Sequence, residues 1–217
     1  MRSRQIETYK RQLKIRPEQH ETLVGLLLGD GCLETQNQGR TYRLKIEQAA
    51  RHETYVKHLH SAFAEWVLTP PRERQVVRNG VTTRNIRFQT VSHAAFRVYG
   101  AAYYAGRTKK VPDQIEEWLT PRALAYWFMD DGSMKSRESK GVILNTQAFC
   151  LSGIERLVAI LTERFGLIAQ RRFQDDGYQI YISGFSFESF REVIDPYLTE
   201  DMRYKLPQAR RTELPKR

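Results

Sequence analysis

The sequence has few of the residues that build disulfides, thiolate metal sites or membrane spans. Only Cys32 and Cys150 occur in 217 residues, which excludes a disulfide framework and a cysteine-rich zinc site. No apolar run approaches the roughly 18 residues that a membrane helix needs. The polar, basic N-terminus lacks the apolar core of a secretory signal. We therefore expect an intracellular, soluble protein without a membrane partner, in a mitochondrion, a chloroplast or the bacterial cytoplasm.

Acidic residues are also in deficit. There are 35 Lys and Arg against 25 Asp and Glu, which gives a formal net charge of +10. Such an imbalance favours a polyanionic partner, with nucleic acid before an anionic membrane. The hydrophobic content of 41% is ordinary for a globular protein, and the length fits one large domain or two small ones.

Two apolar runs that end abruptly in Asp-Gly stand about half a chain length apart. They are residues 23–31 (LVGLLLGDG) and 124–132 (LAYWFMDDG). The first run is apolar on every side except at Gly25, which predicts a helix buried all round. Gly25 and Gly29 share one face of that helix. Because each glycine costs roughly 1 kcal/mol relative to alanine in a helix, the pair indicates close approach of another helix.

The two terminal aspartates, Asp30 and Asp131, stand where a carboxylate is least favoured. The C-terminal end of a helix is the negative end of its dipole, and two carboxylates brought together repel each other. A divalent cation relieves both problems, and hard oxygen ligands suit Mg²⁺. The alternative is that each Asp-Gly simply forms a turn after its helix. The duplication favours the metal site over two unrelated turns.

The order helix, strand, helix, strand, strand, helix is predicted twice, which indicates an internal duplication. The first copy is expected at 17–29, 41–48, 51–67, 73–78, 83–90 and 93–104, with a hairpin turn at Asn79-Gly80. The second is expected at 121–131, 141–147, 152–165, 168–174, 178–183 and 186–195, with a turn at Asp176-Gly177. We expect a basic arm at 1–16, halves at 17–108 and 109–207, and a basic tail at 208–217.

Both Asp-Gly runs resemble the motif of the LAGLIDADG homing endonucleases, in their single-chain, two-motif branch. Residues 119–132 (LTPRALAYWFMDDG), 142–147 (VILNTQ) and 204–207 (YKLP) look closest to the yeast mitochondrial intron-encoded group. The resemblance implies an α+β fold of two pseudo-symmetric αββαββα halves around a central two-helix interface. Their antiparallel sheets would form a saddle over double-stranded DNA. One chain with this internal pseudo-two-fold symmetry is expected to act as a monomer.

The resemblance also implies the active-site residues. Asp30 and Asp131 would bind metal between the scissile phosphates, and the backbone carbonyls of Gly29 and Asp130 would complete the coordination. The cofactor would be Mg²⁺, with Mn²⁺ able to substitute. Each half would add a lysine beside the site. Lys205 is the match in the second half, whereas Lys109 and Lys110 both fit the first half, with a slight preference for Lys109.

The exposed faces of the predicted strands are the expected DNA-reading surfaces, because two-stranded ribbons fit the major groove. Alternation places polar side chains together there. Arg suits guanine, and Gln or Asn suits adenine. The set is Arg43, Lys45, Asn85, Arg87 and Gln89 in the first half, and Gln147, Gln170, Arg172, Gln174, Gln179 and Tyr181 in the second. Lys135 and Arg137, with the N-terminal arm and the tail, are expected to contact phosphates. A solvated sheet face would also look polar.

These features predict a homing endonuclease that makes Mg²⁺-dependent double-strand breaks and spreads its intron or intein. Two diverged halves need not read a palindrome, so a long asymmetric site is expected. One alternative is a splicing maturase that binds intron RNA on the same fold, and another is a non-catalytic DNA-binding regulator. Intact Asp30 and Asp131 favour cleavage over both.

Overall fold

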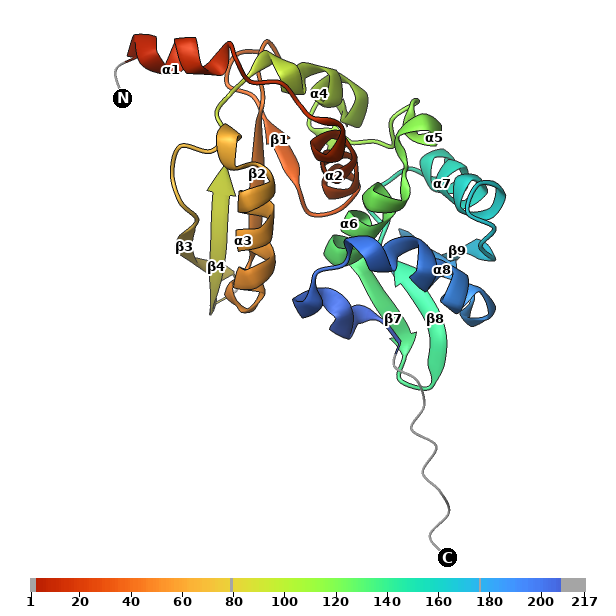
Figure 1. The fold of residues 1–217 in the computed structure, drawn as a ribbon. Coiled ribbons are helices and arrows are strands. Elements are labelled where there is room, and N and C mark those ends of the chain that lie inside the picture. Colours follow the sequence, from red (N-terminus) through yellow and green to blue (C-terminus); the bar gives the residue numbers. More distant parts are fainter. Residues whose placement is uncertain (1–2, 79, 176, 208–217) are drawn as a thin grey trace, which may run out of the picture.

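Two helices lie side by side at the centre of the molecule, with a sheet on either side of them (Figure 1). The computed structural model describes residues 3–78, 80–175 and 177–207. The central helices are α2 (Pro17–Leu28) and α6 (Pro121–Asp131), which carry the two Asp-Gly motifs. Each has Pro at its first position, where the fixed φ suits a helix start. The Thr120 side chain also caps α6 by accepting the N–H of Ala123.

Each half contains one antiparallel four-stranded sheet. The first has the order β1-β2-β4-β3, with strands Cys32–Glu34, Arg43–Ala49, Val81–Gln89 and Arg72–Arg78. The second has the order β7-β8-β10-β9, with strands Gly132–Ser136, Ser139–Leu144, Gly177–Ile182 and Ala169–Gln174. The equivalent strand orders confirm the predicted α+β fold of two αββαββα halves.

The remaining helices cover the sheets and join the halves. They are α1 (Ser3–Lys10), α3 (Glu53–Ala62), α4 (Arg97–Tyr103), α5 (Ile115–Trp118), α7 (Leu151–Glu163) and α8 (Phe187–Ile194). A short hairpin of two-residue strands, β5 (Tyr104–Ala105) and β6 (Thr108–Lys109), lies at the junction between the halves. In the described part of the chain, no helix is long and apolar enough to cross a bilayer.

The pattern-based order missed one strand in each half. Strand β1 has three residues and β7 follows directly from the Asp-Gly of α6, so neither shows a readable alternation. The prediction of a single helix at 51–67 is also wrong, because the observed helix is shorter. It ends at Ala62 and is followed by a 3-10 turn, Ala64–Trp66, because Trp66 is fully buried and its indole N–H reaches Gln19. The expected helix at 93–104 starts as a 3-10 turn, Ala94–Phe96.

Residues 106–112, at the junction between the halves, contain one strand of the β5–β6 hairpin, whose pairing joins Tyr104 to Lys109. The N-terminal arm is helical over Ser3–Lys10, and the chain after it is anchored where Leu13 is buried. The two predicted hairpin turns include Asn79 and Asp176, which lie outside the described residues, as does the tail 208–217. Gly80 has φ +77°, the left-handed conformation that glycine adopts without cost.

The glycines of α2 have the close helix contact that their spacing predicts. A Cβ at Gly25 would lie 2.3 Å from the backbone oxygen of Ala123, and one at Gly29 would lie 2.4 Å from the Cβ of Asp130. Residues 23–28 are at most 1% exposed wherever a side chain is present. The backbones of α2 and α6 therefore touch along their length.

Gly25→Ala tests this contact. Alanine favours an exposed helix by up to about 1 kcal/mol, but here its methyl group would meet the α6 backbone. We expect overpacking to cost about 1–3 kcal/mol and to lower the melting temperature, measured by circular dichroism. The matched control, Ala101→Gly on the exposed side of α4, measures the propensity difference alone. A rise in melting temperature for Gly25→Ala would contradict the contact.

Candidate active site

The two motif aspartates lie at adjacent ends of α2 and α6. Helix α2 ends at Leu28, so Asp30 lies just beyond it, whereas α6 continues through Asp131. The backbone N–H of Asp30 donates to Asp130 Oδ2 at 3.0 Å, which joins the two helix ends directly. The carboxylates of Asp30 and Asp131 are close enough that Asp30 raises the pKa of Asp131.

A lysine from each half donates to backbone carbonyls at these helix ends. Lys109 Nζ donates to the carbonyl of Gly29 at 2.6 Å. Lys205 Nζ donates to the carbonyls of Met129 at 2.5 Å and Asp130 at 2.7 Å. The backbone N–H of Lys110, by contrast, donates to the carbonyl of Tyr103. Of the two lysines left open for the first half, the structure brings Lys109 to the aspartates.

Burial and crowded charge shift the acid–base behaviour of the cluster. Burial first, and Asp30 second, raise the pKa of Asp131 to about 7, while Lys109 and Lys205 act in the opposite direction. Burial lowers the pKa of Lys109 and of Lys205, and the nearby aspartates oppose that change. Three aspartates and two lysines therefore meet here, with Asp130 buried, Asp131 half-buried and Asp30 exposed. Such a cluster favours an additional cation.

Asp130 is the most buried of the three aspartates, at 8% exposed. Its Oδ1 accepts the hydroxyl of Tyr55 at 2.9 Å, and its Oδ2 accepts the Asp30 N–H. Burial, followed by the charge of Asp30, holds the pKa of Asp130 well above its usual range, although both hydrogen bonds lower it. The Asp130 side chain thus binds the Asp30 backbone and Tyr55, while the Asp130 carbonyl accepts a hydrogen bond from Lys205.

Three polar residues at the site were missed by the sequence reasoning. Gln48 Nε2 donates to Asp30 Oδ2 at 2.8 Å, and Asn145 Nδ2 donates to the backbone oxygen of Asp131 at 2.9 Å. Asn145 directly follows the buried run that ends β8, which was the available signal, whereas Gln48 is the penultimate residue of β2, where burial alternates. The third is Tyr55, and a buried tyrosine on an amphipathic helix gives no sign of its partner.

The donor set fits a hard divalent cation. In the part of the chain that the structure describes, no three His, Cys, Asp or Glu side chains are arranged to hold a metal ion. The candidate ligands are therefore two carboxylates, Asp30 and Asp131, with the carbonyls of Gly29 and Asp130. All are oxygens, as Mg²⁺ and Mn²⁺ prefer. Both carbonyls already accept hydrogen bonds from lysine ammonium groups, so a positively charged group can reach each of them.

The first sheet presents a mostly basic face on the side opposite its core. Ile86 and Phe88 are buried, whereas Arg87 and Gln89 between and beyond them are exposed, as the alternation predicts. Register places Lys45 beside Gln89, and Arg72 and Arg74 beside Arg87 and Asn85. Arg43 and Lys45 both pair with Glu34. A hollow of about 450 Å³ lined by Arg43, Lys45, Arg72, Arg87 and Gln89 lies on this face. Arg72 and Arg74 were not predicted.

The second sheet presents glutamine and tyrosine. Arg172 pairs with Gln179 and Gln170 with Tyr181, so the predicted residues of β9 and β10 share one face. The ammonium of Lys135 lies 5.0 Å from the centre of the Tyr181 ring, and Gln174 pairs with Gly177. Gln179 also donates to Asn145, which links this face to Asp131. Gln147 is half-buried beside Gly177, and Arg137 lies in the exposed β7–β8 turn.

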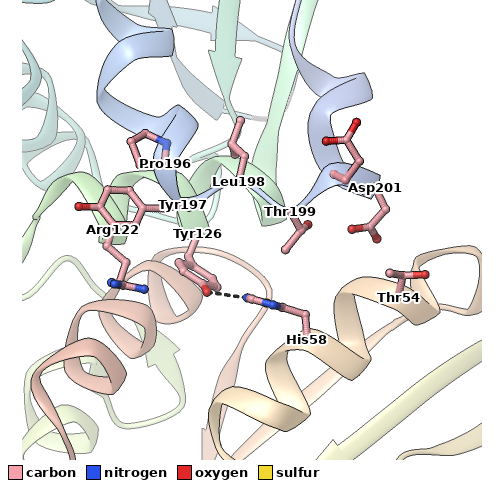
Figure 2. A pocket seen from close by; sticks show the side chains of 10 residues that line it. Thr54, His58, Arg122, Tyr126, Pro196, Tyr197, Leu198, Thr199 and Asp201 are labelled. Carbon is pink, nitrogen blue, oxygen red and sulfur yellow. Dashed lines mark hydrogen bonds between the residues drawn. The ribbon is translucent and has the colours of Figure 1, made fainter.

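A separate hollow of about 780 Å³ lies between α3, α6 and the segment 196–201 (Figure 2). In it, His58 Nε2 and the Tyr126 hydroxyl are hydrogen-bonded at 2.8 Å, with Arg122 and Asp201 nearby. His58 is thus engaged in the interface between halves. None of the proposed aspartate and lysine residues of the site lines this hollow.

Comparison with known proteins agrees with this geometry. Residues 20–190 match the LAGLIDADG DNA endonuclease family. The probable intron-encoded endonuclease 1 of Wickerhamomyces canadensis is 33% identical over 94% of this chain and 90% of that protein. The cytochrome b mRNA maturase bI2 of Debaryomyces hansenii is 29% identical over 87% of this chain and 73% of that protein.

The fold is similarly shared with a solved structure. The homing endonuclease I-WcaI bound to its DNA recognition sequence has a TM-score of 0.90 and 30% sequence identity, over 96% of this chain and 95% of that one. The chain therefore belongs to the LAGLIDADG DNA endonuclease family, and it is a site-specific DNA endonuclease of the homing type, as its paired Asp-Gly motifs predicted.

Proposed function

We propose that the chain makes double-strand breaks at a long asymmetric DNA site and requires a divalent metal, Mg²⁺ or Mn²⁺, to do so. The observation that carries this proposal is the meeting of Asp30 and Asp131 at adjacent helix ends, with lysines on the flanking carbonyls. A bound divalent metal would supply positive charge to both the attacking and the leaving oxygens of a phosphodiester.

The chain's own residues have distinct roles in this proposal. Asp30 and Asp131 would hold the metal, with the carbonyls of Gly29 and Asp130 at its edge. Lys109 and Lys205 would move from those carbonyls toward the scissile phosphates and offset their negative charge. Burial already lowers the pKa of both lysines, so either can also take up or release a proton near the attacking water more readily than a surface lysine.

DNA recognition would be divided between the two halves, 17–108 and 109–207. The first sheet offers mainly arginine and lysine, and the second offers glutamine with Tyr181. Unlike faces suit unlike half-sites, which supports an asymmetric target read by a monomer. The net charge of +10 supplies attraction to phosphates independent of sequence.

A second candidate function is intron-RNA binding in splicing, favoured by the maturase among the relatives. Both functions are compatible with a gene carried by an organellar or bacterial intron, and the endonuclease would spread that intron or an intein. The cluster of Asp30, Asp131 and two lysines favours DNA cleavage as the main activity. A tight intron-RNA complex without cleavage of the intron-free DNA site would favour the maturase.

Asp30→Asn and Asp131→Asn should abolish cleavage of a plasmid that carries the intron-free site. Each removes one negative ligand while keeping the side-chain shape. We expect at least about 100-fold slower cleavage, since even residues that only support metal ligands contribute about 10–100-fold. DNA affinity, measured by gel shift in Ca²⁺, should change little.

Asp113→Asn is the matched control, because the Asp113 side chain is highly exposed and forms a surface ion pair with Arg156. It should cleave like the parent. Equal cleavage by Asp30→Asn, Asp131→Asn and the parent would show that the assigned roles are wrong.

In metal-free protein, the Asp131 carboxyl should contribute stability at about pH 5 that is lost as pH rises through about 7, whereas the four histidines whose pKa burial lowers (His20, His52, His58 and His93) act in the opposite direction. The pKa of Asp131 is about 7 in the folded state and about 3.9 in an unfolded chain. Between these values the folded state thus holds a proton at Asp131 that the unfolded chain has lost, so this contribution disappears as pH rises through about 7. Denaturant unfolding in chelator measures the slope of stability against pH. Asp131→Asn should remove the contribution of Asp131 but not that of Asp130, whose pKa is also raised. An unchanged slope in that variant would contradict the assignment.

DNA binding should weaken steeply with salt. Proteins with several phosphate contacts lose roughly 10³-fold or more in affinity between about 50 and 200 mM salt. Lys135→Gln should reduce the slope of log K against log salt by about 1. Lys57→Gln, an exposed lysine on α3 outside both sheet faces, should leave it unchanged. Fluorescence anisotropy measures both, and a flat salt response would exclude a phosphate-dominated interface.

A further inference from the structure

Both carboxylate oxygens of the buried Asp130 have protein partners. Oδ2 accepts the backbone N–H of Asp30, and Oδ1 accepts the hydroxyl of Tyr55 on α3. A single side chain of the second half therefore binds two elements of the first half, the chain just past α2 and helix α3.

We propose that Asp130 is a positioning residue that holds Asp30 in place through its side chain, an inference that rests on the proposed metal-binding role of Asp30. The neighbouring amides have acceptors within α2: Gly29 N–H reaches Gly25 and Gly31 N–H reaches Leu26. The Asp30 N–H instead depends on the other half. With its amide held by Asp130 and its carboxylate by Gln48, Asp30 is fixed at both ends.

The two helices end differently, and this explains why the Asp30 backbone needs a support that the Asp131 backbone does not. Helix α6 includes Asp131, so regular helical geometry holds the backbone of that aspartate. Helix α2 ends two residues before Asp30, which therefore needs an external acceptor. Asp130 and Gly29 take matched positions in the two motifs. A Cβ at Gly29 would lie 2.8 Å from Asp130 Oδ2, so the missing side chain at 29 leaves room for the carboxylate.

Tyr55 completes the support from the opposite side. It is fully buried at 0% exposed, and its hydroxyl donates to Asp130. A buried hydroxyl without a partner is costly, so this bond orients the Asp130 side chain and fixes which oxygen faces Asp30. Tyr55→Phe should leave the Asp30 bond in place but less firmly held.

Amide hydrogen exchange of Asp30, measured by NMR on the metal-free full chain without DNA, tests the proposal. Asp130→Ala removes the acceptor and should accelerate exchange at Asp30 by about 10-fold to 100-fold. Asp130→Asn should largely restore protection, because its amide oxygen accepts from Asp30 and its NH₂ group donates to Tyr55. The cleavage rate constant with Mg²⁺ should fall in Asp130→Ala and recover in Asp130→Asn, with DNA affinity unchanged.

Asp131→Ala is the matched control, since it removes a neighbouring carboxylate without touching the Asp30 N–H. It should leave Asp30 exchange unchanged. If Asp130→Ala does not fold, the Asp30 amide resonance of Asp130→Asn decides, because a changed acceptor must shift it. An unshifted resonance, or unchanged exchange in a folded Asp130→Ala, overturns the proposal. Accelerated exchange together with no DNA cleavage by the parent supports the positioning role and overturns the proposed function.

Discussion

Close approach of the α2 and α6 backbones is the constraint on which the rest of the structure depends. It requires glycine at 25 and 29, because a Cβ at either position would collide with α6. Once the two backbones touch, their C-terminal ends come together. The aspartates that follow, and the lysines that reach those ends, then become one cluster. The saddle of two sheets is a consequence, since each sheet begins directly after one of these helices.

The same approach creates an electrostatic cost. Carboxylates meet at the negative ends of two helix dipoles, and those of Asp130 and Asp131 are buried or half-buried. Lys109 and Lys205 offset part of this cost through the helix-end carbonyls, and Tyr55 and Gln48 provide hydrogen bonds to the aspartates. The raised pKa of Asp131 shows that the offset is incomplete. A cluster in this state favours divalent metal, which is the physical basis of the proposed catalysis.

The two halves share one topology and differ in chemistry. The first sheet presents arginines and lysines, several of them paired with Glu34 and Glu47, while the second presents glutamines and Tyr181. The same divergence appears at the motifs, where Gly29 of one half faces Asp130 of the other. The two halves therefore share one topology, whereas their exposed sheet faces and their Asp-Gly motifs differ.

The sequence by itself determined the buried helices, the glycine contact, the duplication and the aspartates, although not strands β1 and β7, because periodicity and motif spacing are local properties. It also placed Arg87, Gln89, Gln170 and Arg172 on open strand faces through alternation. Only the tertiary structure decided between Lys109 and Lys110 as the lysine beside the site, and it alone revealed Gln48, Asn145 and the Tyr55–Asp130 pair. These contacts join residues from separate elements, and no local pattern encodes which side chains meet when two helix backbones touch.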